Sequence, residues 1–147
     1  MRRTALSALL ILCVLQAVSC ATDKSGITDE TFNRIYDKYA NKLILDGAVT
    51  YTVKNGDSLS KISEEKYGNQ FYYPVIMLAS RSLAVDPDKI QPGMQLTIID
   101  LEKNLADRNA KAAVKGVISD CVPIERERNG ENSAQMMREH AIKLLAK

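Results

Sequence analysis

The chain of 147 residues contains no tryptophan, one histidine and only six tyrosines and two phenylalanines. A large ligand pocket lined with aromatic rings is therefore not expected. The single histidine, His140, lies near Met136 and Leu144 on an amphipathic segment, which indicates a residue at the edge of a core rather than a catalytic base. Cys121 has no second histidine with which to form a dyad. No histidines, cysteines and carboxylates share metal-ligand spacing. We therefore expect no catalysis, no cofactor and no metal.

The sequence also lacks a strong excess of either charge. The formal net charge is +2, and Arg2 and Arg3 at the extreme N-terminus account for it, since the rest of the chain has 18 basic and 18 acidic residues. A neutral mature chain argues against a nucleic-acid partner, which would require a concentrated basic face. It also argues against electrostatic docking on a membrane. The hydrophobic content of 46% is that of an ordinary globular protein, and the length suits one ordinary domain or one small domain with helical additions.

No apolar run is long enough to cross a membrane as a helix. The longest, residues 4–18, is shorter than the roughly 20 residues that a span requires. Two arginines precede it and small residues follow it, which is the layout of a secretory signal peptide. The alternative is a buried helix at the start of the domain, but polar sequence follows at once and no amphipathic face is visible.

The end of this leader reads Ala17-Val18-Ser19-Cys20, which resembles a lipobox, the processing sequence of bacterial lipoproteins. The resemblance implies a signal peptide at 1–19, cleavage before Cys20, lipidation of Cys20 and a tether at 20–27. The mature protein would then be a periplasmic, membrane-anchored lipoprotein. Ala17 departs from the usual branched apolar residue, so cleavage by ordinary signal peptidase after Ser19 or Ala21 remains an alternative.

Cysteine is too scarce for a disulfide framework. Cys13 would leave with the leader and Cys20 would carry lipid, so Cys121 would be alone in the mature chain. A lone thiol could pair between chains. We favour a partly buried, small apolar residue next to Val122.

The pattern of the mature chain predicts a helix, a compact module of strands and helices, and then more helices. Thr28 is a good N-cap, and Phe32, Ile35 and Tyr36 follow at helical spacing, which predicts a helix over 28–47. The next elements expected are a strand at 49–53, a turn at 55–58 leading into a helix capped by Ser58, a second helix at 71–80, a loop at 81–94 and a strand at 95–99.

The C-terminal extension, 100–147, is predicted to be a helical hairpin. A loose apolar stripe runs from Leu101 to about Ser119, and Pro123 is expected to end that helix. The alternating charges of 125–128 suggest a solvated link. Asn132 or Ser133 is expected to cap the last helix.

Residues 51–98 carry the most specific motif. The segment begins with YTVKNGDSLSKI at 51–62, continues with Tyr67-Gly68 and closes with DPDKIQPGMQLTI at 86–98. It resembles a LysM domain. The resemblance implies an α+β fold, with a βααβ module at 49–99 flanked by the N-terminal helix and the C-terminal hairpin. Two strands alone are not stable, so the helices must cover them. The core expected for the module is Val53, Leu59, Ile62, Ile76, Leu96 and Ile98.

The LysM resemblance also implies a shallow groove that binds N-acetylglucosamine-containing glycan, as in peptidoglycan or chitin. Carried over by position, the first wall of this groove is Gly56, Asp57, Ser58 and Leu59. The second wall is Ser80, Arg81, Ser82 and Leu83, with Ile90 below. Gly56 and Asp57 equally suit a turn and Leu59 equally suits a core, so both interpretations of these residues stay open.

Three functional hypotheses follow. The first is a non-catalytic lipoprotein that binds peptidoglycan and tethers the membrane to the wall. The second is an envelope adaptor in which 101–147 binds a protein partner or self-associates through Met136-Met137 and Leu144-Leu145, unless these pack on the first helix. The third is a LysM fold kept only as a scaffold.

Overall fold

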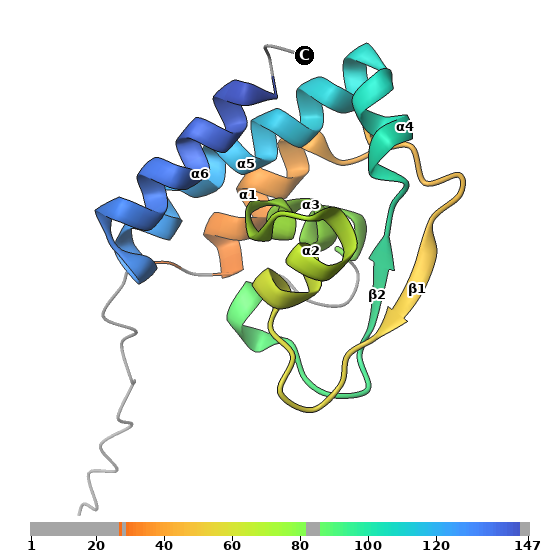
Figure 1. Ribbon diagram of the computed structural model, residues 1–147, viewed down its shortest axis with the longest axis horizontal. Coiled ribbons are helices and arrows are strands. Elements are labelled where there is room, and N and C mark those ends of the chain that lie inside the picture. The colour runs from red at the N-terminus through yellow and green to blue at the C-terminus, as the bar shows by residue number, and fades with distance from the viewer. Residues whose placement is uncertain (1–26, 28, 82–85, 145–147) are drawn as a thin grey trace, which may run out of the picture.

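The computed structural model describes residues 27, 29–81 and 86–144, and its chain forms an antiparallel strand pair covered by helices (Figure 1). Strands β1 (Val49–Thr52) and β2 (Gln95–Ile98) enclose helix α2 (Leu59–Tyr67), the 3₁₀ turn η1 (Gln70–Tyr72), helix α3 (Tyr73–Ala79) and the 3₁₀ turn η2 (Pro87–Lys89). Helix α1 (Asp29–Tyr39) precedes them, and α4 (Leu101–Ala106), α5 (Arg108–Asn129) and α6 (Glu131–Lys143) follow. The expected α+β fold with a flanked βααβ module is confirmed.

The βααβ module has the core that the sequence predicts. The strands pair in the register Val49 opposite Ile98 and Tyr51 opposite Leu96. All six residues of the predicted core are buried. Burial of this apolar surface against α2 and α3 stabilises a strand pair that would not persist alone.

Local signals set the ends of α2. Ser58 caps its N-terminus, where the Ser58 hydroxyl accepts a hydrogen bond of 3.3 Å from the Lys61 amide. At its C-terminus, Gly68 adopts the left-handed conformation with φ 69° and donates its N–H to the Glu64 carbonyl. Helix α3 begins at Tyr73, two residues after the predicted start at residue 71, because the 3₁₀ turn η1, capped by Asn69, precedes it.

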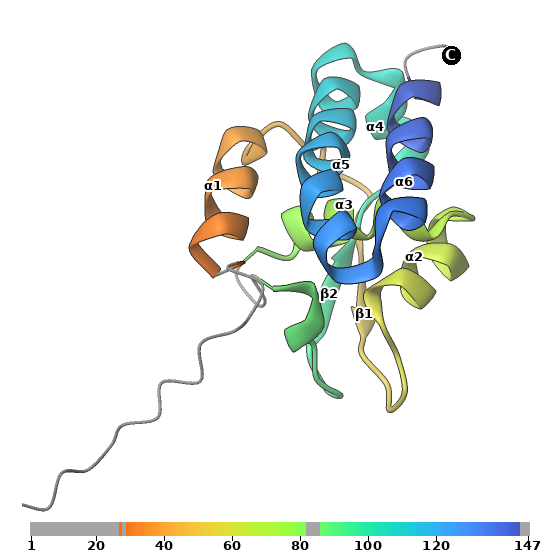
Figure 2. The ribbon, with the colours of Figure 1, turned by 90° about the vertical axis from the view of Figure 1, so that its left-hand side faces the viewer.

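Helix α5 is the centre of the helical part and lies between α1 and α6 (Figure 2). It also packs on α3, so it joins the helical part to the LysM-like module. Its buried face includes Val114, Val117, Ile118 and Cys121. Cys121 is fully buried, so this thiol is a core residue rather than the partly buried one expected.

The predicted N-terminal boundaries need correction. Helix α1 ends at Tyr39 rather than near residue 47, and Asn41 follows in the left-handed region with φ 62°. The segment after it is held by buried Asn104, which accepts from the Ile44 amide at 2.8 Å and donates to the Ile44 carbonyl at 2.9 Å. Ile27, assigned to the tether, is buried in the core. The predicted cap Thr28 and the lipidation site Cys20 lie outside the described residues.

The C-terminal hairpin also differs from the prediction. Pro123 does not end the helix: α5 continues to Asn129, with Val122 and Ile124 buried on either side of the proline. Their burial offsets the hydrogen bond that proline cannot donate. The hairpin turns at Gly130, which has φ 88° and lies between α5 and α6. Neither residue 132 nor residue 133 caps α6.

In the described part of the chain, no helix has the length and apolar character needed to cross a membrane.

Candidate functional site

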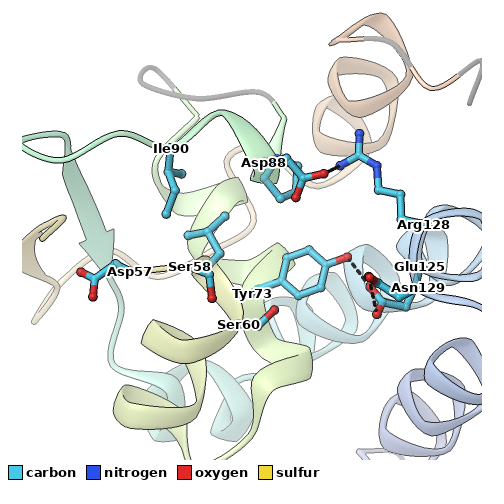
Figure 3. Close-up of a pocket in the computed structure, with 11 residues that line it drawn as sticks. Asp57, Ser58, Ser60, Tyr73, Asp88, Ile90, Glu125, Arg128 and Asn129 are labelled. Carbon is cyan, nitrogen blue, oxygen red and sulfur yellow. Dashed lines mark hydrogen bonds and ion pairs between the residues drawn. The ribbon is translucent and has the colours of Figure 1, made fainter. Parts of the chain in front are cut away.

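A groove of about 240 Å³ opens where the start of α2, the η2 segment and the end of α5 meet (Figure 3). Its lining residues are Asp57, Ser58, Leu59, Ser60, Tyr73, Pro87, Asp88, Ile90, Glu125, Arg128 and Asn129.

The first wall of the groove is the β1–α2 turn, with Asp57, Ser58 and Leu59. The Asp57 carboxylate accepts hydrogen bonds of 2.8 Å from the Lys54 amide and from the Tyr51 hydroxyl. The Lys54 amide and then the Tyr51 hydroxyl lower the pKa of Asp57 below its ordinary value. Asp57 therefore fixes the shape of this turn. Gly56, with φ 83°, makes the bend but does not line the groove, and its carbonyl accepts from the Lys61 ammonium at 3.2 Å.

Side chains at the start of α2 contribute to the groove unequally. Leu59 is only 3% exposed, so most of it belongs to the core and only its edge reaches the groove. Ser58 is exposed and serves as the helix cap. Ser60 lines the groove and makes no hydrogen bond to another described side chain, so its hydroxyl is available to a ligand. The sequence analysis did not include Ser60.

Two residues that the resemblance placed in the second wall, Ser80 and Arg81, lie outside this groove. Ser80 is 1% exposed, and its hydroxyl accepts a 2.7 Å hydrogen bond from the Thr97 amide beside β2. Arg81 forms an ion pair with Asp37 of α1. Neither lines the groove, while Ser82 and Leu83 lie outside the described residues.

The η2 segment forms the second wall instead. Asp86 caps η2 by accepting a 3.0 Å hydrogen bond from the Asp88 amide, and Pro87, Asp88 and Ile90 face the groove. Ile90, which the resemblance placed below the second wall, is one of the residues that line the groove. The Asp-Pro-Asp turn former was the sequence signal for this wall.

A third wall comes from α5, outside the LysM-like segment. The Arg128 guanidinium donates to both carboxylate oxygens of Asp86, at 2.8 and 3.0 Å, and forms a 2.8 Å ion pair with Asp88. It also lies 5.2 Å from the centre of the Phe32 ring of α1. The prediction of a solvated link was therefore wrong for this residue, which connects α1, η2 and α5.

Glu125 connects the same wall to the core. It is buried, and its carboxylate accepts hydrogen bonds from the Tyr73 hydroxyl at 3.0 Å, the Asn129 amide at 3.0 Å and the Ser133 hydroxyl at 2.6 Å. Burial raises the pKa of Tyr73 well above its ordinary value, and the nearby Glu125 carboxylate adds to this rise, so Tyr73 remains a donor. The sequence analysis missed this role because an alternating charge run normally faces solvent.

The groove has the character of a binding site. Hydroxyl, amide and carboxylate groups surround a small apolar surface from Leu59 and Ile90. His140 lies elsewhere, with its ring 4.5 Å from that of Tyr72. Within 27, 29–81 and 86–144, no group of three or more histidine, cysteine or acidic side chains could hold a metal ion.

Residues 51–98 match the LysM domain family, which agrees with the observed βααβ segment. The chain is 50% identical over 48 residues to the potassium binding protein Kbp of Escherichia coli O6:H1, a match that covers 33% of this chain and 32% of that protein. It is 52% identical over 52 residues to an uncharacterized protein of Deinococcus radiodurans, covering 35% of this chain and 20% of that protein. The chain thus spans a third or less of these relatives. No solved structure matches it significantly.

Proposed function

Taking residues 51–98 as a LysM domain, we propose that this chain binds N-acetylglucosamine-containing glycan of peptidoglycan, without catalysis, in the groove between α2 and η2. The observation that carries the proposal is the position of this groove. Two of its three walls, 57–60 and 87–90, belong to the segment that matches the LysM family.

The chemistry of the two LysM walls suits an uncharged, acetylated sugar. Hydroxyls such as that of Ser60 donate and accept hydrogen bonds, and Ile90 offers apolar surface for an acetamide methyl group. A groove of this size buries little ligand surface, so we expect weak binding by one site. The potassium binding recorded in the name of the Escherichia coli relative is not part of the proposal, because only 32% of that protein is matched.

The second part of the proposal is a lipid anchor on Cys20 that holds the protein in the periplasm beside the wall. Its support is the leader sequence with Ala17-Val18-Ser19-Cys20. Anchoring would raise the effective concentration of the groove near glycan strands and so compensate for weak affinity.

Metabolic labelling with a fatty acid tests the lipid anchor: the chain should be labelled and a Cys20→Ser variant should not. Absence of label on both would reject the anchor.

The packing of α6 favours the glycan-binding proposal over the adaptor hypothesis, because it buries much of the apolar face that a partner would contact. Met137 and Leu144, proposed to contact a partner, are buried within the protein, as are Ala134 and Ala141. α6 packs mainly on α5. Met136 and Ile142 are 50% and 57% exposed, and they are the large apolar side chains of α6 that remain available to a partner.

Isothermal titration of the purified chain with a soluble N-acetylglucosamine tetramer tests glycan binding. Ser60→Trp should fill the groove and abolish binding. The control, Thr50→Trp, places the same ring on an exposed position of β1 that does not line the groove. Binding by wild type and Thr50→Trp with loss in Ser60→Trp supports the proposed site. Equal binding by all three would place glycan elsewhere, and no binding to wild type would reject the function.

A further inference from the structure

We propose that the glycan site of this chain is composite: Asn129 at the end of α5, outside the LysM segment, contacts the bound sugar. Glu125 and Arg128 act as positioning residues that hold the walls around it. This inference rests on the proposed glycan binding, and it adds to that function a binding residue that a LysM domain by itself would not contain.

The first support is the placement of Asn129. Its side chain lines the groove and is exposed, and its amide nitrogen donates to Glu125 at 3.0 Å. That hydrogen bond sets the orientation of the amide. Among the described residues, no hydrogen bond to the amide oxygen of Asn129 is present, so this oxygen can accept from a ligand hydroxyl. Figure 3 shows Asn129 and Glu125 on one side of Tyr73, with Ser58 and Asp57 of the first wall on the other.

The second support is that the end of α5 is fixed before any ligand binds. Glu125 accepts three hydrogen bonds, which connect α5 to α3 through Tyr73 and to α6 through Ser133. Arg128 connects α5 to η2 through Asp86 and Asp88. A wall held by two independent connections loses little conformational entropy on binding, which favours affinity.

The third support concerns the ligand. Asp57 and Asp88 add negative charge to the groove, and Arg128, the cation among its lining residues, is already paired with Asp86 and Asp88. An anionic ligand would meet repulsion there. The donor and acceptor of an amide suit hydroxyl and acetamide groups. The composite groove therefore fits an uncharged stretch of N-acetylglucosamine.

The test compares Asn129→Ala with Asn132→Ala in the full chain. Asn132 is exposed at the start of α6, does not line the groove and provides a matched loss of an amide. Because one hydrogen bond contributes about 0.5–1.5 kcal/mol, Asn129→Ala should weaken binding of the N-acetylglucosamine tetramer about two- to tenfold. Asn132→Ala should bind as wild type does. In the wild-type protein, the side-chain amide resonances of Asn129 should shift on addition of the tetramer.

The outcomes separate this inference from the function on which it rests. The composite site would be overturned if the wild type binds, Asn129→Ala binds with the same affinity and the Asn129 amide resonances do not shift. The LysM groove would then remain the binding site. No binding to wild type would overturn both. If Asn129→Ala does not fold, the amide resonances of the wild-type protein decide: a shift supports the contact, and no shift overturns it.

Discussion

Replacing Arg128 by methionine should destabilise the protein substantially, although the residue stands in a run of charges. Asp86 is 6% exposed, and Arg128 is its charged partner at 2.8 and 3.0 Å. Methionine keeps apolar contact with Phe32 but leaves the Asp86 carboxylate with the Asp88 amide as its one donor among the residues that the structure describes. Breaking a buried ion pair costs about 3–5 kcal/mol. The Arg128 side chain is 17% exposed and one donor to Asp86 survives, so we expect a loss of about 2–3 kcal/mol.

Urea unfolding of four proteins measures this loss: wild type, Arg128→Met, Asp86→Asn and the double variant. If Arg128 and Asp86 are coupled, the double variant should lose less unfolding free energy than the two single variants lose together. The difference should be at least about 1 kcal/mol. The loss in Arg128→Met corresponds to a fall of about 6–12 °C in melting temperature for a chain of this size.

A control distinguishes a buried pair from an ordinary surface pair. Arg126, two residues away on α5, pairs with Glu131 in an exposed position. Arg126→Met should cost less than about 0.5 kcal/mol, as exposed ion pairs do. If Arg128→Met costs no more than Arg126→Met, then Arg128 does not hold η2 against α5, and the reasoning about the third wall fails.

Three further predictions follow from buried groups. Burial alone would raise the pKa of Asp86, but the hydrogen bonds from Arg128 and the Asp88 amide outweigh burial and lower this pKa below its ordinary value. The stability that ionised Asp86 contributes should therefore be present above about pH 4 and be lost as the pH falls through the lowered pKa. Urea midpoints at pH 7 and pH 3 should therefore differ less in Asp86→Asn than in wild type, and an equal difference would contradict this. A Cβ at Gly116 would clash with the Tyr39 ring, so Gly116→Ala should destabilise the protein by about 1–3 kcal/mol despite the better helix propensity of alanine. Tyr39→Ala should relieve the clash in a double variant, and stabilisation by Gly116→Ala alone would refute the close contact. Cys121 is fully buried, and burial raises the pKa of its thiol. The thiol should therefore react with a chromogenic disulfide only when the protein unfolds, and fast reaction in the native state would contradict the packing of α5.

The sequence alone determined the LysM module because its signals are local. Ser58 caps α2 from one residue away, and Gly68 ends it with the left-handed conformation that glycine adopts at low cost. The expected order of strands and helices, taken with the LysM resemblance, gave the six residues of the module core. The first wall of the groove followed from the same turn.

The tertiary structure decided which charged and polar side chains are buried, and with them the second and third walls. Arg128 and Asp86 are 42 residues apart, and Asn104 and Ile44 are 60 residues apart, so no local pattern pairs them. Alternating charges predict solvent exposure on average, yet Glu125 is buried because Tyr73, Asn129 and Ser133 satisfy its carboxylate. Propensity likewise placed a helix end at Pro123, but packing of its neighbours overrode the lost hydrogen bond. Sequence periodicity indicates the average environment of a residue. A buried polar group also needs a partner, and here that partner comes from a distant part of the chain, so the pair is known only once the helices have packed.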